Sequence, residues 1–344
     1  MGRSDFVLGR LGGARSRLLS SGGLLDLLAR PDLLSRLERL RASLWGGTLP
    51  TAPAGRAPDL DALEASLAEA FRREIRSILE DLGGLPKRLF RSFLLFDDAA
   101  SLKGPFRALA RGKKPEEAAS LVEPSAGLGS EVLLDLVATN DASAAAARLA
   151  EAKSPFAPAV AAHAGELRKP GGLFRLEVAL DRVAFEAVEQ DARGPGADRA
   201  VLRELAGARA DLANARLLLA LAGAPEADEF RMPGGLRIGE GAFREMAGLA
   251  GPPLARRLAG ALRDLVGLSE RASALLSDPL KADHLVARAL ARKALTLARG
   301  LPLTLAVPCA FALALGEELK RVRLALRGTE LGFPPALLLD LMEA

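Results

Sequence analysis

A short pattern of charged residues recurs three times along the chain at nearly equal intervals. It reads acid, two residues, a polar or basic residue, one apolar residue and then a base, and its copies begin at Asp98, Asp211 and Glu318. The intervals are 113 and 107 residues. Repetition at a nearly constant period is typical of one structural unit used several times. The spacing therefore predicts three similar helical units, and it restricts the fold more than any other feature of the sequence.

The acid and the base of each copy point in different directions if the copy is helical. A helix turns about 100° per residue, so side chains five positions apart are directed roughly 140° apart. Each side chain is then free to reach a neighbouring helix, and the acid of one copy can meet the base of the next. The alternative is that these are solvated charges on amphipathic helices. The candidate contact residues are Asp98, Lys103, Asp211, Asn214, Arg216, Glu318, Arg321 and Arg323.

The composition favours an all-α fold. Leu and Ala dominate, there is no Tyr, aromatic residues make up 4%, and residues that favour strands are sparse. With 344 residues the chain is long enough for two or three units with a substantial buried core. The single cysteine, Cys309, excludes an internal disulfide framework, and we expect a buried, inert thiol there.

The net charge of the chain is compatible with several classes of binding partner, and its hydropathy predicts no membrane span. The chain has 47 basic and 43 acidic residues, a mild excess that suits an acidic protein, a lipid headgroup or a nucleic acid. No N-terminal targeting signal is expected. The longest uncharged run, residues 300–316, is shorter than the roughly 20 residues of a membrane span and contains Pro302 and Pro308. It therefore predicts a buried helix.

Breaks rich in glycine and proline divide the chain into units at residues 1–112, 113–224 and 225–344. Pro115-Glu116 opens the second unit and Pro225-Glu226 the third, and each opening is followed by a Gly-Leu pair, Gly127-Leu128 and Gly235-Leu236. The glycine-rich segment 233–241 lacks the order of a phosphate-binding loop and predicts a turn.

Helices are expected at similar places in each unit. Apolar residues spaced three and four apart predict long helices over about 59–82 and 173–192, each ahead of the helix that carries the acid. Near the N-terminus the pattern predicts two helices separated near Gly22-Gly23 and Pro31.

A second landmark supports the alignment of the units. Leu63-Glu64 corresponds to Leu176-Glu177, and each glutamate lies 34 residues before the acid of its unit. The same offset from Glu318 leads to His284, so the landmark is lost in the third unit.

Together these motifs resemble the C-type stalk protein of the archaeal and bacterial A/V-type rotary ATPases, the equivalent of the d-type protein of the vacuolar enzyme. The resemblance covers nearly the whole chain and depends on the order and spacing of short motifs. Ser101 and Arg321 stand where the family has a polar amide, and the family's tyrosines are absent. The matching residues are Arg10 to Arg17 with Leu18-Leu19, then Asp98, Ser101, Leu102, Lys103 and Gly112, then Asp211, Asn214 and Arg216, then Glu318, Arg321, Arg323, Arg327 and Gly328.

The resemblance implies a funnel of three similar helical bundles with pseudo-threefold symmetry. It implies one copy in a large complex, placed between the central-stalk subunits of D and F type and the membrane proteolipid ring, on the cytoplasmic face of the membrane. Such a protein transmits torque in ion transport coupled to ATP hydrolysis or synthesis, has no active site, and binds no cofactor, metal, small molecule or nucleic acid.

The residues alone argue against an enzyme, and they leave a nucleic-acid-binding protein and an unrelated helical scaffold as alternatives. His163 and His284 have no ligands at metal-site spacing, and no nucleophile or nucleotide motif is present, so an enzyme is not indicated. A nucleic-acid binder requires basic residues clustered on one face, whereas arginines here alternate with acids, as in residues 72–76. A helical scaffold unrelated to rotary motors is the remaining alternative.

Overall fold

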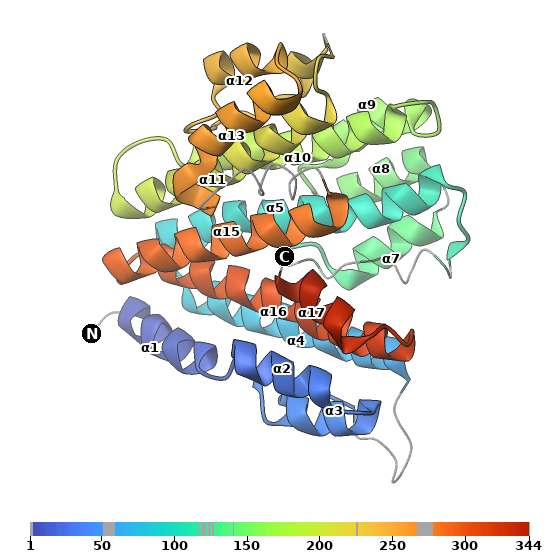
Figure 1. The fold of residues 1–344 in the computed structure, drawn as a ribbon, viewed down its shortest axis with the longest axis vertical. Coiled ribbons are helices and arrows are strands. Elements are labelled where there is room, and N and C mark those ends of the chain that lie inside the picture. Colours follow the sequence, from blue (N-terminus) through green and yellow to red (C-terminus); the bar gives the residue numbers. More distant parts are fainter. Residues whose placement is uncertain are drawn as a thin grey trace. The chain divides into compact units, whose positions relative to one another are not determined.

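The computed structural model is helical throughout the part of the chain that it describes (Figure 1). The described residues are 3–50, 59–115, 117, 122, 125, 127–139, 141–224, 226–266 and 278–343. No strand occurs among them, and the predicted all-α fold is confirmed. Glu116 and Pro225, which open the second and third predicted units, lie outside the described residues.

The order of the helices repeats along the chain. Short helices come first and are followed by two long ones, and the second long helix carries the acid of the motif. The first set is α1 (Arg3–Arg15), α2 (Ser21–Ala29), α3 (Leu33–Arg41), η1 (Leu44–Gly47), α4 (Leu60–Asp81) and α5 (Gly84–Ala110). The second set is α7 (Ser130–Ala138), α8 (Ala142–Glu151), α9 (Ala157–His163), η2 (Ala164–Glu166), α10 (Gly172–Asp191) and α11 (Ala197–Ala220). The third set is η3 (Ala227–Phe230), α12 (Glu240–Ala247), α13 (Gly251–Val266), α15 (Pro279–Gly300), α16 (Ala306–Glu330) and α17 (Pro335–Glu343). The unit boundaries at 112/113 and 224/225 themselves stay a prediction.

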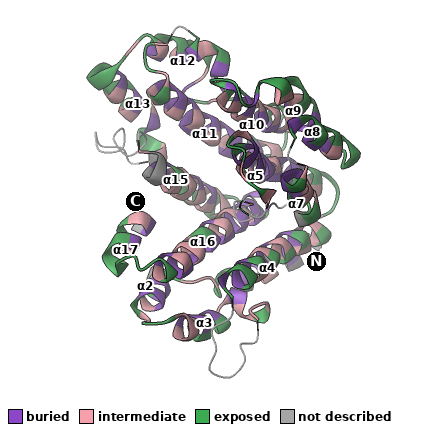
Figure 2. Ribbon diagram, turned by 90° about the vertical axis from the view of Figure 1, so that its right-hand side faces the viewer, coloured by how far each residue is buried: buried purple, intermediate pink, exposed green. Residues whose placement is uncertain are grey.

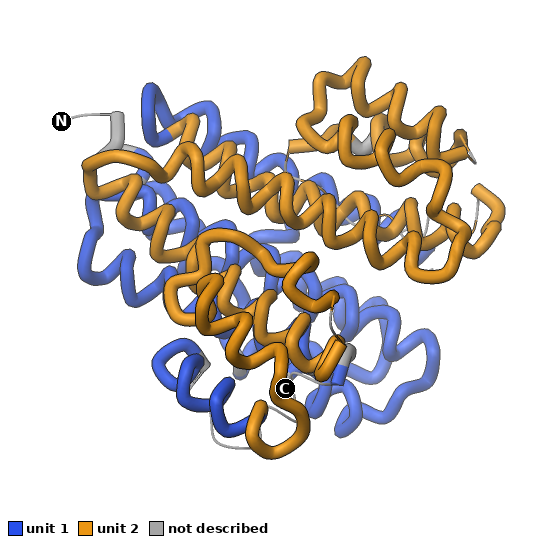
Figure 3. The backbone as a smooth tube through the Cα atoms, turned by 90° about the horizontal axis from the view of Figure 1, so that it is seen from above, with its two compact units in different colours: residues 1–86, 255–344 blue, residues 87–254 orange. Residues whose placement is uncertain are grey.

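Contacts within the chain define two compact units (Figure 3). Unit 1 comprises residues 1–86 and 255–344, and unit 2 comprises residues 87–254. In unit 1, α16 packs against α15, α4, α1 and α17, so both ends of the chain contribute to one core. In unit 2, α10 packs against α9 and α11, and α8 packs against α7 and α9.

The apolar stripe of α4 buries one face of this helix. The helix predicted over about 59–82 is observed from Leu60 to Asp81. Leu63, Leu67, Ile75 and Ile78 recur at steps of three, four or multiples of them and are fully buried. Burial of a side chain of this size stabilises the fold by about 1.5–3 kcal/mol.

The helices that carry the three acids are buried on more than one face. On α5, α11 and α16, buried residues occur all around the helix and include polar ones, whereas α4 is buried along a stripe (Figure 2). A helix without a solvent face is central to its core. An acid in the middle of such a helix must find hydrogen-bond donors inside the protein.

The N-terminal prediction is right about one break between helices and wrong about the other. The break near Pro31 is observed between α2 and α3, whereas Gly22 and Gly23 lie inside α2 and the break ahead of α2 falls at residues 16–20. Ser20 explains the difference, because its hydroxyl accepts a hydrogen bond from the backbone N–H of Gly23 at 3.1 Å and begins the helix. This N-cap outweighs the low helix propensity of two glycines.

The uncharged run 300–316 is helical only in its second part. α16 begins at Ala306, and Cys309 is fully buried as expected. Residues 301–305 form a turn whose leucines 301 and 303 are exposed, because Pro302 ends α15. None of the helices in the described part of the chain is long and apolar enough to cross a bilayer.

Candidate functional site

The three motif acids lie in the middle of long helices and are buried. Asp98 on α5 is 5% exposed, Asp211 on α11 is 1% exposed and Glu318 on α16 is 5% exposed. Burial of a carboxylate is costly unless hydrogen bonds satisfy its oxygens. The donors to these three carboxylates therefore determine what the motif does.

Asp98 binds the loop that precedes α7. Its Oδ1 accepts hydrogen bonds from the backbone N–H groups of Gly127 at 2.9 Å and Leu128 at 3.3 Å, and from the hydroxyl of Ser125. A Cβ at position 127 would collide with the Asp98 carboxylate. Glycine is therefore required at this point for the loop to approach the acid.

Asp211 binds the loop that precedes α12 in the same way. Its Oδ1 accepts from the backbone N–H groups of Arg237 at 3.0 Å and Ile238 at 2.8 Å. A Cβ on Gly235 would lie 2.9 Å from that oxygen, closer than real Cβ contacts allow. The predicted turn is confirmed over 233–239, which is the segment that the acid holds, whereas residues 240 and 241 begin α12.

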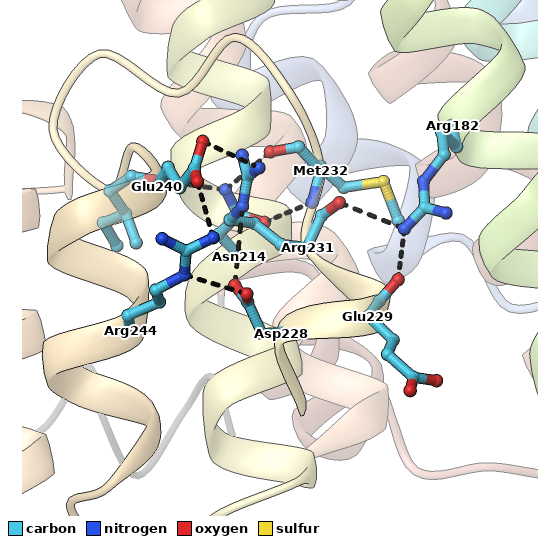
Figure 4. A network of polar contacts seen from close by, with 9 residues as sticks. Arg182, Asn214, Asp228, Glu229, Arg231, Met232, Glu240 and Arg244 are labelled. Carbon is cyan, nitrogen blue, oxygen red and sulfur yellow. Dashed lines mark hydrogen bonds and ion pairs between the residues drawn. The ribbon is translucent and has the colours of Figure 1, made fainter. Parts of the chain in front are cut away.

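Asn214, one turn after Asp211, completes the attachment of this segment (Figure 4). Its amide nitrogen donates to the carbonyls of Met232 at 3.0 Å and Ile238 at 2.9 Å, and its amide oxygen accepts from the Met232 N–H at 2.7 Å. Arg182 on α10 donates to the carbonyls of Glu229 and Arg231 from the other side. The segment between η3 and α12 is thus held by α10 and α11 together.

Glu318 makes the corresponding contact with the beginning of the chain. Its Oε2 accepts from the backbone N–H of Leu19, just ahead of α2, at 2.8 Å, and its Oε1 accepts from the indole Nε1–H of Trp45 at 2.7 Å. The buried Arg36 on α3 donates to the carbonyl of Ala325 on α16 at 2.7 Å. The acid of the third copy therefore attaches the N-terminal segment to α16.

These contacts share one geometry, which we call the acid–loop contact. In each, a carboxylate in the middle of a buried helix accepts backbone N–H groups from the loop ahead of a short helix. The predicted meeting of acid and base from neighbouring copies is wrong for these three acids. Their oxygens bind loop donors, because backbone N–H groups satisfy a buried carboxylate without burying a second charge.

The bases of the first copy bind the first long helix of the second copy. Lys103 forms an ion pair with Asp181 on α10 at 2.7 Å. One turn later, Arg107 pairs with Glu177 at 2.6 Å and 3.0 Å through two guanidinium nitrogens. A two-nitrogen contact of this kind fixes orientation as well as distance.

The bases of the third copy bind the first long helix of the first copy in the same pattern. Arg323 pairs with Glu64 on α4 at 3.1 Å, and Arg327 binds the same carboxylate at 2.5 Å and 2.9 Å. Arg327 lies nine residues after its acid, as Arg107 does, and Glu64 is the landmark equivalent of Glu177. The landmark glutamates are thus the partners of these arginines.

The corresponding pair between the second copy and the third unit does not exist, because neither residue is present. Ala220 stands nine residues after Asp211, and His284 occupies the landmark position of the third unit. His284 instead lies 3.8 Å from Glu317 on α16, and Glu317 pairs with Arg321 at 3.1 Å. Arg216, the base of the second copy, is half-buried on α11.

Burial and hydrogen bonding move the pKa of several of these carboxyl groups. Burial raises the pKa of Asp98 and of Asp211 against the hydrogen bonds from their loops, and raises the pKa of Glu318 to about 7. For Glu64 burial acts in the same direction, but the guanidinium groups of Arg327 and Arg323 outweigh it and lower the pKa. Glu64 is therefore charged, whereas the acid–loop carboxylates are easier to protonate.

The arrangement is suited to holding helices and loops in place. Among the described residues, no group of three or more His, Cys, Asp or Glu side chains is placed to hold a metal ion. The sequence interpretation missed Glu64, Glu177, Asp181 and Arg107 as partners. The repeated Leu-Glu landmark was the signal for the two glutamates, and the Gly-Leu pairs were the signal for the loops that Asp98 and Asp211 hold.

Comparison with known proteins identifies the family. The family model described as ATP synthase (C/AC39) subunit matches residues 7–340. The chain belongs to this family. It is a subunit of an ATP synthase of the A/V type, as the resemblance of the repeated motifs implied. No curated protein matches the chain.

The first prediction concerns the glycine of the first acid–loop contact. Gly127→Ala should lower the free energy of unfolding by about 1–3 kcal/mol, because the added methyl group displaces either the loop or the buried Asp98. Gly165→Ala in η2 is the control, since Gly165 is exposed and nothing lies within 4 Å of its Cβ position, and should change stability by about 0.5 kcal/mol or less. Urea unfolding of the purified chain measures both. Equal effects of the two substitutions would contradict the contact.

The second prediction concerns Glu64 and Arg327. A double-mutant cycle with Glu64→Ala and Arg327→Ala should give a coupling free energy of about 1–2 kcal/mol, because the glutamate is buried and bound through two nitrogens. The exposed pair Arg148 and Glu151 serves as the comparison and should give a smaller coupling, because solvent screens it. A coupling no larger than that of the exposed pair would exclude a stabilising role.

The third prediction concerns pH. The pKa of Glu318 rises from 4.5 to about 7 on folding, so the folded state keeps a proton that the unfolded state has lost. The free energy of unfolding should therefore fall by about 3 kcal/mol from this group as the pH rises from 4.5 to 7. Glu318→Gln should flatten this part of the pH profile, and the exposed Glu330→Gln on the same helix should leave it unchanged. A profile unaffected by Glu318→Gln refutes the assignment.

Proposed function

We propose that the chain is the non-catalytic coupling subunit of the central stalk in an A/V-type rotary ATPase. It connects the rotor shaft, through subunits of D and F type, to the membrane proteolipid ring and passes torque between them. One copy lies on the cytoplasmic face of the membrane. The observation that carries this proposal is the family match over residues 7–340, nearly the full chain.

The internal contacts support a role that requires stiffness. A protein that transmits torque must resist deformation, and closely packed helices have low compressibility. The acid–loop contacts fix three connections that would otherwise be free to move. The glutamate and arginine pairs fix the register of long helices against each other in both units.

The candidate residues divide into two roles in this proposal. Asp98, Asp211, Asn214 and Glu318 are buried and act on a partner only by shaping the loops that they hold. The other candidates are basic side chains at the partly exposed edges of helices, and they bind either a neighbouring helix or the stalk. They are Lys103, Arg216, Arg321 and Arg323. The three units of the chain form the three bundles of the funnel.

Native mass spectrometry of the membrane complex tests the assignment. The complex is purified through a tag on this chain. The expected result is one copy of the chain together with stalk subunits of D and F type and the proteolipid ring. Recovery of the chain without these subunits, or with nucleic acid, would favour the scaffold or nucleic-acid alternative.

A fourth prediction links the acid–loop contact to stalk binding. Asp211→Ala leaves the N–H groups of Arg237 and Ile238 without an acceptor, so the loop should change shape and the affinity for a purified D and F stalk should fall about tenfold, which corresponds to about 1.4 kcal/mol. The exposed Glu226→Ala removes a charge nearby and should bind as the parent does. If Asp211→Ala alters neither stalk affinity nor melting temperature, the proposed role of this acid is wrong.

A further inference from the structure

The turn between α15 and α16 exposes apolar side chains at one end of unit 1. Leu301 is 39% exposed and Leu303 is 73% exposed. Leu303 is the most exposed large apolar side chain among the described residues. Apolar side chains that are exposed together in this way can mark a surface that binds a partner.

The turn holds these leucines outward with a regular set of hydrogen bonds. The N–H of Leu301 donates to the carbonyl of Leu297 at 2.7 Å, which completes the last turn of α15. The hydroxyl of Thr304 donates to the carbonyl of Leu301 at 2.7 Å and accepts from the N–H of Ala306 at 3.3 Å. These hydrogen bonds fix the backbone of the turn in the conformation that exposes the two leucines.

An apolar pocket lies beside this turn, between α1, α15 and α16. Its volume is about 140 Å³, similar to engineered apolar cavities of about 150 Å³ that bind benzene. Nothing lies within 4 Å of the position of a Cβ on Gly12, so the pocket is open on the side of α1. The apolar lining consists of Leu11, Leu295, Ala298, Val307, Ala310 and Phe311.

Two arginines stand at the rim of the pocket. Arg15 on α1 and Arg299 on α15 line it and are exposed, and neither forms an ion pair with any residue that the structure describes. Basic residues outnumber acids in the segments around the pocket, although Arg10 on α1 is paired with Asp81 on α4 at 2.8 Å. Residues 6–25 and 284–316 contain seven basic residues and no acid, although the whole chain has a net charge of only +4.

These observations match the chemistry of an anionic lipid surface. Apolar residues that enter the boundary of headgroups and acyl chains, together with arginines that pair with lipid phosphates, make up the two signals that stable attachment to a bilayer requires. A protein partner would need an apolar patch and acidic groups arranged to match this turn, whereas a bilayer that contains anionic lipid presents acyl chains and phosphates together over its whole surface.

We infer that this end of unit 1 binds the surface of a bilayer that contains anionic phospholipid. Leu301 and Leu303 enter the headgroup boundary, Arg15 and Arg299 pair with phosphate groups, and the pocket receives a few methylene groups of one acyl chain. This contact goes beyond the proposed coupling of stalk and ring, which are proteins, and it holds for the purified chain whether or not that coupling role is correct.

Co-sedimentation of the purified full chain with vesicles tests the inference. Vesicles of phosphatidylcholine with about 30% phosphatidylglycerol should bind the chain at least about tenfold more tightly than vesicles of phosphatidylcholine alone, because about 1 kcal/mol per basic residue near the surface corresponds to a factor of several. Binding should weaken as salt is raised from about 0.05 to 0.3 M, since exposed charges are screened over a Debye length of about 10 Å at 0.1 M.

Three variants should each reduce binding at least severalfold. Leu301→Ser with Leu303→Ser removes the apolar contact, Arg15→Glu with Arg299→Glu reverses the rim charge, and Gly12→Leu fills the pocket from its open side. All five positions carry exposed or unobstructed side chains, so circular dichroism melting should match the parent.

Matched controls change the same chemistry elsewhere in unit 1. Arg41→Glu with Arg73→Glu makes the same change in net charge at exposed positions, and Leu331→Ser with Phe333→Ser removes equally exposed apolar groups. Both controls should bind vesicles as the parent does. Unchanged binding of the three test variants, or equal loss in the controls, would overturn the assignment.

A protein partner at the same place gives a different result. If the chain ignores vesicles but binds the purified proteolipid ring in detergent, and the leucine variant abolishes that binding, the surface is a protein interface and the lipid inference is wrong. Failure of the coupling role is seen separately, as absence of the chain from the purified rotary complex.

Discussion

The structure depends on carboxylates that are buried in the middle of helices and bound by the backbone of a loop. Asp98, Asp211 and Glu318 each accept N–H groups from a connection that leads into a short helix. A loop has few apolar contacts of its own, and its backbone N–H groups need acceptors when it lies against a core. The carboxylate supplies that acceptor, and the loop in turn offsets the cost of burying the acid.

This interaction restricts the sequence on both sides. The loop must come within hydrogen-bond distance of the acid, which excludes a side chain at Gly127 and at Gly235. The acid must lie on a helix that is buried around its circumference, as α5, α11 and α16 are. Because burial disfavours the charged form, the pKa of all three acids is raised. The ion pairs of Glu64 and Glu177 act differently, since guanidinium groups reach them from the rim.

Much of the fold could be predicted from patterns along the chain. The stripe of α4 follows from apolar residues at three- and four-residue steps, and α10 was expected over nearly its observed range. The break before α2 was missed, because one serine cap outweighed two glycines. The exposed turn at Leu301 to Leu303 was also missed, because an apolar run does not reveal which of its residues face solvent.

The sequence by itself determined that the chain is all-helical, that a motif recurs three times, and which family the motifs resemble. These features depend on local propensity and spacing, which act over a few turns of helix. Only the tertiary structure decided the partners of the motif, since Asp98 and Gly127 are 29 residues apart and Glu318 and Leu19 are 299 apart. A helical period places a side chain on a face of its own helix, but the donor that meets it is set by the packing of distant segments.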